Sequence, residues 1–192
     1  MTDIQLQIEK YRTKFGANSS CYSMMDDLEE VKALFGHNSM DVFLHRCVCN
    51  RKRHQRRIKS MAVSEAVVKL KREVRSLQEC SYFDELYDLV YLLIGKGRTG
   101  ISYCTVYDTC IRMGYCFSPA ILPQEYVYVH RHLIKEANSI LGYGHIKDRC
   151  RIRRNLFDET DKGFIQMSSL EIEDFLCVKQ QLIKEQIKRK QV

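Results

Sequence analysis

The chain has few of the features that interrupt ordered structure or lead a chain to a membrane. It has only two prolines in 192 residues and neither a low-complexity linker nor an internal repeat. No apolar run approaches the roughly 20 residues that cross a bilayer, and the longest candidate is 89–94. Segment 1–15 lacks an apolar run of signal-peptide length. We therefore expect no membrane span and no secretory leader, and the 45% of apolar residues predicts an ordered globular protein.

Disulfide bonds and metal sites are also disfavoured. The nine cysteines are odd in number and, without a signal peptide, are typical of reduced thiols in a cytoplasmic protein. His45, Cys47, Cys49 and His54 are four potential zinc ligands within ten residues. Their spacing matches no closed structural zinc site, because helical positions two apart point to different faces. We expect buried thiols here, a histidine on a basic face, and neither a metal nor a cofactor.

Positive charge is concentrated in blocks. The chain has a net charge of +7, and 46–75 has eleven Lys or Arg residues and two acids, a local +9. Segment 147–154 has five basic residues and one acid, a local +4, whereas 1–45 has four basic residues and seven acids, a local −3. Such blocks favour a polyanionic partner. The alternative for 51–57 is a solvated helix face that binds nothing acidic.

Apolar periodicity and capping signals predict an all-α protein. The predicted helices cover 3–15, 25–35, about 39–50, 60–77, 82–93, 99–113, 131–141 and about 168–190. Ser81 with Asp84 is expected to open the helix at 82, and Gly114 to close the helix that begins at 99. Gly142 and Gly144 are expected to end the helix 131–141, and Ser168 with Glu171 forms a capping-box pattern before the last helix. An apolar seam is predicted along 60–77, made of Val63, Val67, Leu70, Val74 and Leu77. One short β element is predicted at 126–129. This pattern indicates a multi-helix bundle with regions 1–80 and 81–192 in one continuous globular unit.

The most informative segment is a glycine-rich turn between two apolar segments. Gly95, Gly97 and Gly100 allow the backbone to turn tightly, and Lys96 and Arg98 add positive charge, so a phosphate is the expected ligand. The spacing also fits a dinucleotide-binding fingerprint, with 89–94 as a strand. That interpretation needs an acid about 20 residues later. Only Glu125 is near, and it precedes the apolar run, so this alternative is disfavoured.

Segment 95–100, Gly-Lys-Gly-Arg-Thr-Gly, resembles the phosphate loop of protein tyrosine phosphatases. In that family a cysteine six residues before the arginine attacks phosphorus. The corresponding residue here is Leu92, and Cys104 lies on the wrong side of the loop. The resemblance therefore implies a phosphate-ligand binder without catalytic activity.

Segment 100–105, Gly-Ile-Ser-Tyr-Cys-Thr, resembles the Gly-Ile-Gly-x-x-Thr hairpin of helix-hairpin-helix DNA-binding motifs. In those motifs the hairpin amides contact the phosphate backbone without reading sequence. Ser102 stands where the second glycine belongs, and the glycines upstream could supply the turn instead.

Segment 100–130 is similar to a group of uncharacterised bacterial proteins that share a Thr-Val-Tyr-Asp-Thr core, here 105–109. This resemblance brings no assigned activity. Tyr107 and Asp108 have two interpretations that the sequence leaves open: a buried tyrosine near a capping carboxylate, or a functional pair.

Taken together, these features predict a non-enzymatic, cytoplasmic nucleic-acid-binding protein that contacts phosphates and has no membrane partner. An alternative is an interaction module whose basic faces meet an acidic protein partner or a second copy of the chain. No catalytic residues are predicted. The predicted phosphate-binding residues are Gly95, Lys96, Gly97, Arg98, Gly100, Ile101, Ser102, Arg51, Lys52, Arg53, Arg56 and Arg57.

Overall fold

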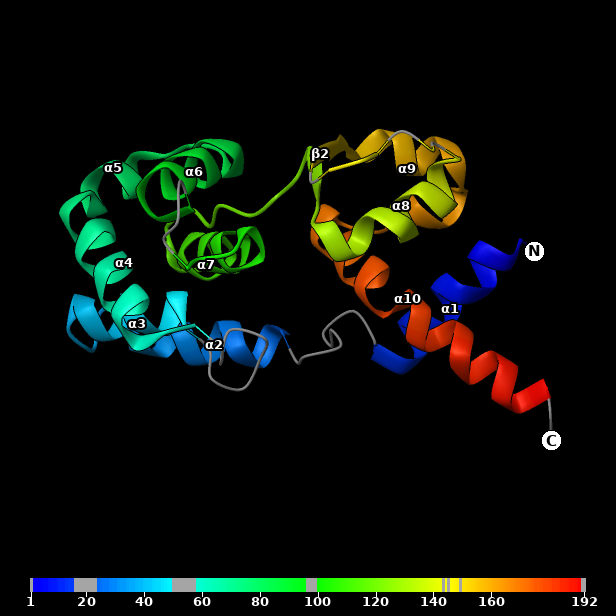
Figure 1. Cartoon of the computed structure of the whole chain (residues 1–192), viewed down its shortest axis with the longest axis horizontal. Helices are drawn as coiled ribbons and strands as arrows, with labels where there is room; N and C mark the ends of the chain where they lie inside the picture. The colour runs from blue at the N-terminus through cyan, green and yellow to red at the C-terminus, as the bar shows by residue number, and fades with distance from the viewer. Residues whose placement is uncertain are drawn as a thin grey trace. The chain divides into compact units, whose positions relative to one another are not determined.

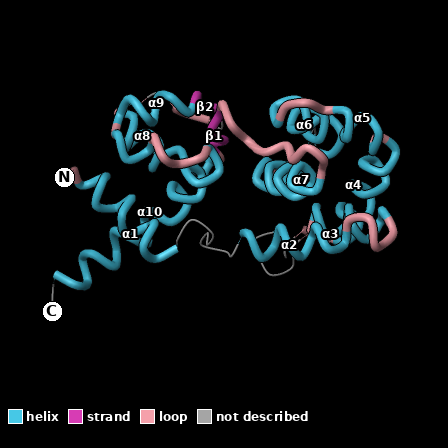
Figure 2. Tube along the Cα trace, turned by 180° about the vertical axis from the view of Figure 1, so that it is seen from behind, coloured by secondary structure: helices cyan, strands magenta, loops and turns pink. Residues whose placement is uncertain are grey.

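A computed structural model describes residues 2–15, 24–49, 58–95, 100–142, 144, 146–148 and 150–190. This part of the chain is mostly helical with one sheet of two strands, which confirms the predicted all-α class (Figures 1 and 2). None of the helices described is long and apolar enough to cross a membrane. The chain divides into a central unit, 26–122, and a terminal unit, 1–25 with 123–192. The boundary suggested by the sequence, between residues 80 and 81, lies inside the central unit. Helices on both sides of it pack together there.

The central unit is built on a long helix, α7, that packs against α3 and α6, while α3 also packs against α4. Its elements are α2 (Met24–Leu34), α3 (Met40–Val48), α4 (Ser60–Arg72), α5 (Val74–Glu79), α6 (Phe83–Val90), the π-helix η2 (Tyr91–Gly95) and α7 (Tyr103–Cys116). Helical backbone over α6 and η2 contradicts the alternative in which 89–94 is a strand, because that segment packs on α7 and α4 through one apolar face.

Local signals place some helix starts of the central unit to within one residue. The helix predicted to start near Ser39 does so, and the Ser39 side chain caps α3 by accepting a hydrogen bond from the Val42 amide. The predicted helix 60–77 is interrupted at Glu73, where ψ is 16°, and continues as α5. The apolar seam predicted along 60–77 is nevertheless largely buried: Val63, Val67, Leu70 and Leu77 are all below 9% exposure.

Two predicted helix ends are wrong. The helix predicted to open with Ser81 and Asp84 is capped through Glu85, whose carboxylate accepts from the Ser81 amide at 2.8 Å. Gly114 does not end α7, which continues to Cys116. A Cβ at position 114 would overlap the carbonyl oxygen of Ile121. Glycine is therefore needed there for close approach of the following loop, not for a helix stop.

The terminal unit joins the two ends of the chain: α1 packs on α10, and α10 covers β1. Its elements are α1 (Asp3–Phe15), β1 (Tyr126–Val129), the 3₁₀ helix η3 (Arg131–Leu133), α8 (Ile134–Leu141), β2 (Cys150–Arg153), α9 (Arg154–Thr160), the 3₁₀ helix η4 (Lys162–Phe164) and α10 (Ser169–Lys190). The core contains three aromatic rings in edge-to-face contact, those of Phe157, Phe164 and Phe175.

Sequence patterns anticipated part of this unit. The short strand 126–129, the left-handed stop at Gly142 (φ +68°) and the capping box of Ser168 and Glu171 are confirmed. The predicted helix 131–141 begins as the 3₁₀ turn η3. Strand β2 and helix α9 were not predicted, because β2 is short and rich in arginine and becomes a strand only by pairing with β1.

Candidate nucleic-acid interface

The glycine turn joins η2 to α7, and two of its glycines are required by its geometry. A Cβ at Gly95 would overlap the Tyr91 ring and lie 2.9 Å from Val106 Cγ2. Gly100 has a φ of +76°, which side chains of L-residues rarely adopt. The predicted binding residues Lys96, Gly97 and Arg98 lie outside the described residues.

Ser102 ends the turn as the N-cap of α7. Its backbone is extended (φ −82°, ψ 161°), and its Oγ accepts a hydrogen bond from the Thr105 amide at 3.1 Å. A second glycine is not needed at this position, because the left-handed residue is Gly100. The side chain of Ile101, between them, is only 7% exposed. In the described part of the turn, the Ser102 side chain is therefore exposed and the Ile101 side chain is not.

Two tyrosines join the helices that precede and follow the turn. The hydroxyl oxygens of Tyr91 in η2 and Tyr103 in α7 are 2.5 Å apart, and the ring centroids are 4.8 Å apart. This pair fixes η2 against the first turn of α7. Sequence reasoning missed it, although the two tyrosines lie close on either side of the glycine turn.

Gly100 lies beside the beginning of α4. A Cβ at Gly100 would be 3.6 Å from the Ala62 Cβ, an ordinary van der Waals distance, and α4 also packs on η2. Ala62 is in the first turn of α4, whose N-cap is Lys59. The predicted binding residues Arg51, Lys52, Arg53, Arg56 and Arg57 directly precede this helix and lie outside the described residues. Gly100 and Ala62, which follow the two predicted binding segments in the chain, are thus neighbours.

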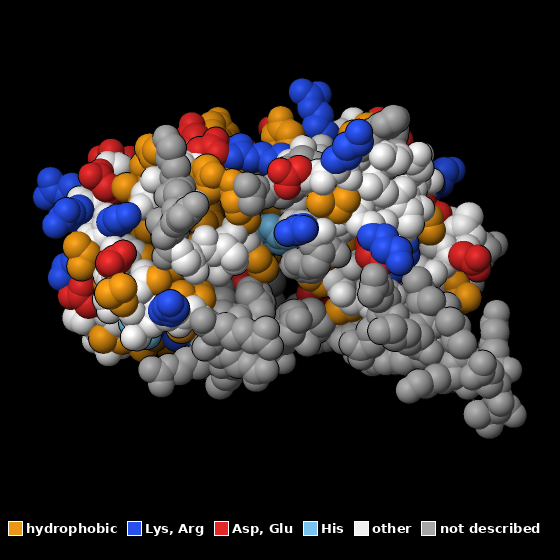
Figure 3. All heavy atoms as spheres, in the orientation of Figure 1, with side chains coloured by type: hydrophobic (Ala, Val, Ile, Leu, Met, Phe, Trp, Pro, Cys, Tyr) orange, Lys and Arg blue, Asp and Glu red, His pale blue; other side chains and the backbone are white. Residues whose placement is uncertain are grey.

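Helix α4 and the start of α5 carry further positive charge to the surface. The exposed basic side chains are Lys59, Lys69, Lys71, Arg72 and Arg75. Lys71 Nζ pairs with Asp41 at 2.6 Å, which joins α4 to α3. Figure 3 shows Lys and Arg side chains at the outer edge of the central unit, over α4 and α5, with acidic side chains among them. The described surface here is therefore of mixed charge, and the strongest positive density is in the sequence run before α4.

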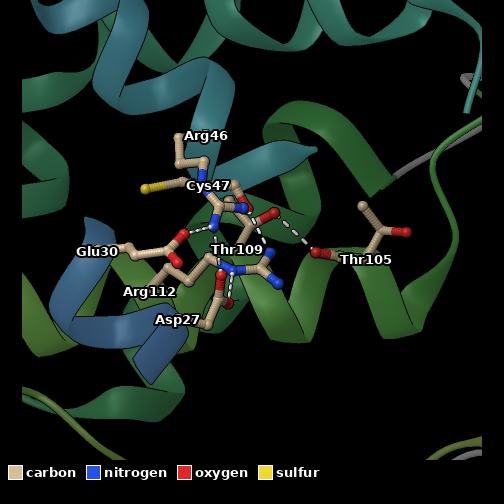
Figure 4. A network of polar contacts seen from close by, with 7 residues as sticks. All are labelled: Asp27, Glu30, Arg46, Cys47, Thr105, Thr109 and Arg112. Atoms are coloured by element: carbon tan, nitrogen blue, oxygen red, sulfur yellow. Dashed lines mark hydrogen bonds and ion pairs between the residues drawn. The ribbon is translucent and has the colours of Figure 1, made fainter. Parts of the chain in front are cut away.

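A buried ionic network holds α7 in place (Figure 4). Arg112, 2% exposed, donates to Asp27 Oδ2 at 2.8 Å and to the carbonyl of Cys47 at 2.7 Å. Arg46 pairs with the other oxygen of Asp27 at 2.9 Å. Burial opposes the charge on Arg112, but Asp108 and Asp27 outweigh it, so the pKa of Arg112 lies above its ordinary value. The network ties α2, α3 and α7 together, and sequence reasoning did not identify Arg112.

The Thr-Val-Tyr-Asp-Thr core lies in α7 and faces the protein interior. Tyr107 is 1% exposed and meets the Phe83 ring edge-on, with centroids 5.9 Å apart. Asp108 supports the charge of Arg112, and Thr109 Oγ1 donates to the Thr105 carbonyl within the helix. These contacts give the core a packing role. The Leu92 side chain is 59% exposed in η2 and provides no nucleophile.

Of the two cysteines that sequence spacing offered as zinc ligands, Cys47 is buried in the core and Cys49 is the C-cap of α3. Burial raises the pKa of the Cys47 thiol well above its ordinary value, and Cys49 follows it at the end of α3. His54 lies outside the described residues. Over the described ranges, no group of three or more His, Cys, Asp or Glu side chains is placed to hold a metal ion. Comparisons with protein-family models, curated proteins and solved structures found no match to this chain.

Proposed function

We propose that this protein is a non-enzymatic nucleic-acid-binding protein that contacts mainly the phosphate backbone. The observation that carries the proposal is the closeness of Gly100 to the start of α4, where a Cβ at Gly100 would lie 3.6 Å from the Ala62 Cβ. The run Arg51–Arg57 precedes α4 in the chain, and 46–75 has a local charge of +9 from eleven basic residues and two acids. The described residues that follow the two segments suited to phosphates are therefore neighbours.

The chemistry of these segments suits phosphate contacts better than base contacts. Amides of a glycine turn and of a helix start can donate to phosphate oxygens, and Lys and Arg neutralise phosphate charge. Such contacts position a protein on nucleic acid without reading its sequence. They also release counterions, so the affinity falls steeply as salt increases.

The test compares two doubly substituted proteins. Lys96→Ala with Arg98→Ala removes two charges from the turn, whereas Lys135→Ala with Lys162→Ala removes two exposed charges from the terminal unit. Fluorescence anisotropy with a labelled random-sequence duplex is measured over a salt series. The turn variant should lower the magnitude of the salt slope by about 1.8, roughly 0.9 for each lost contact, and the control should leave it unchanged.

Circular dichroism of both variants checks that the helices remain. If the wild-type chain binds neither duplex nor single strands at low salt, the proposed function is wrong and an interaction module with an acidic protein partner becomes the better hypothesis. If the turn variant and the control behave alike, the turn is not the contact surface.

A further inference from the structure

Helix α4 has exposed apolar side chains on the side away from its own core. Six large apolar side chains are exposed in the described part of the chain, and α4 has two of them, Met61 at 69% and Val68 at 48%. They are seven residues apart, so they lie on one side of the helix, about 10 Å apart along its axis. The buried side chains of α4, on its opposite side, are Val63, Ala66, Val67 and Leu70. Figure 1 shows α4 at the outer edge of the central unit.

Two opposite charges lie on the same side of α4. Glu65 and Arg72 are exposed, and each follows one of the two apolar residues by four positions. They are seven residues apart, too far for a pair within the helix, which forms at a spacing of three or four. Within the described part of the chain, neither of them forms an ion pair. We call these four residues the α4 stripe: Met61, Glu65, Val68 and Arg72.

The order of charges in the α4 stripe is complementary to its own reverse. In a two-fold dimer, residue i of one copy contacts residue j of the other, and j contacts i. If two α4 helices lie antiparallel with the two-fold axis beside Val68, Glu65 of each copy lies beside Arg72 of its partner. The two Val68 side chains then meet at the centre, with one ion pair on either side of them.

The charges also disfavour the other register that brings apolar side chains together. With the axis midway between Met61 and Val68, each Met61 would meet Val68 of the partner, but the two Glu65 side chains would face each other beside the axis. Like charges at such short range repel. The register with its axis beside Val68 replaces this repulsion with two attractions, and Met61 then lies at the end of the contact.

We propose that the α4 stripe is a homodimer interface, through which two copies of this chain associate by an antiparallel, two-fold contact. The inference goes beyond nucleic-acid binding and does not rest on it. The stripe is small, and interfaces below about 1,200 Å² belong to weak, transient complexes. The dimer should therefore form as the protein concentration rises and dissociate on dilution. Added salt should weaken it, because salt screens exposed ion pairs.

The test exchanges the two charges of the stripe, singly and together. Glu65→Arg brings like positive charges together across the contact, and Arg72→Glu brings like negative charges together. Each single variant should raise the dimer dissociation constant about tenfold. The double variant, Glu65→Arg with Arg72→Glu, restores both ion pairs and should dimerise as the wild type does. An equimolar mixture of the two single variants should also dimerise, because each supplies the charges that the other needs. Sedimentation equilibrium without nucleic acid measures the association.

Two further variants complete the experiment. Lys135→Glu reverses an exposed charge in the terminal unit and should leave the dissociation constant unchanged. Val68→Ser removes an exposed apolar side chain without changing any charge and should weaken the dimer. Circular dichroism checks that all variants keep their helices. The inference is overturned if the wild type stays monomeric at every concentration, if a single variant dimerises as well as the wild type, or if the mixture associates no better than either single variant alone.

Discussion

The two units bury charge in different ways. In the central unit the buried charges meet at one junction, where Arg112 bonds both Asp27 and the Cys47 carbonyl. In the terminal unit the buried polar groups are spread over separate contacts: Lys179 with Glu136, Tyr11 with Asp174, and His130 beside Glu173. A buried charge that loses its partner is costly. The central unit therefore depends on one network joining three helices, whereas the terminal unit can lose one contact and keep the others.

The lengths of these ion pairs sharpen the comparison. The Asp27 carboxylate lies 2.8 Å from Arg112 and 2.9 Å from Arg46, whereas the Glu136 carboxylate lies 3.4 Å from Lys179. Matched substitutions in the two units test the difference, and hydrogen exchange of backbone amides reports on each unit separately.

The largest effect is expected from Asp27→Asn. This change keeps the shape but leaves Arg112 charged and buried beside a neutral amide, so the central unit should lose about 3–5 kcal/mol of unfolding free energy. The matched change Glu136→Gln in the terminal unit should cost less, because Glu136 lies further from Lys179, at 3.4 Å, than Asp27 lies from either of its two arginines. Urea unfolding combined with amide exchange measures both losses, and equal losses would contradict this expectation.

An intermediate effect is expected from alanine at two closely packed glycines. A Cβ at Gly114 would overlap the carbonyl oxygen of Ile121, and backbone cannot rotate away. We expect Gly114→Ala to destabilise the central unit by about 3 kcal/mol, near the upper end for overpacking. A Cβ at Gly163 would instead lie 2.7 Å from Ile8 Cδ1, the end of a flexible side chain. Gly163→Ala should therefore cost the terminal unit clearly less. A larger loss for Gly163→Ala in thermal unfolding would show that Ile8 cannot move aside.

The smallest effect is expected from removing one tyrosine hydroxyl in each unit. Tyr11 donates to the buried carboxylate of Asp174 at 2.9 Å, whereas Tyr91 bonds a second phenol, that of Tyr103. Hydrogen bonds to charged groups contribute about 1.5–3 kcal/mol and neutral ones about 0.5–1.5 kcal/mol. Tyr11→Phe should thus destabilise its unit by about 1 kcal/mol more than Tyr91→Phe does. Denaturant unfolding measures the difference, and the reverse order would contradict this account.

Much of the helical structure could be predicted from local signals. The stop at Gly142, the Ser168–Glu171 box and a helix start near Ser39 depend on residues within one turn of chain, and all three predictions are confirmed. The wrong or missing predictions of helix ends and strands occur where a segment distant in the sequence packs against the chain. Gly114 carries a helix stop signal, but Ile121 packs onto it and α7 continues. Strand β2 has no strand signal of its own and exists because β1 lies beside it.

Some features of the candidate site could likewise be predicted from local sequence, and others depend on contacts between distant segments. The glycines and the basic runs are visible in the sequence, and the left-handed Gly100 and the N-cap Ser102 lie where the motif suggested a turn before a helix. The Tyr91–Tyr103 pair and the partners of Arg112 were not visible. Each depends on two helices meeting at a particular rotation, which no local pattern specifies.

By itself, then, the sequence determined most of the helical segments, the position of the glycine turn and the places where positive charge is dense. These properties depend on neighbours within a few residues, because caps, apolar spacing and chain turns act over one or two helical turns. Only the tertiary structure decided that the chain closes into a central and a terminal unit, that Gly100 meets Ala62, and that Arg112 is buried against Asp27. Those contacts join residues far apart in the chain, and they form only when whole helical faces bury their apolar side chains against one another.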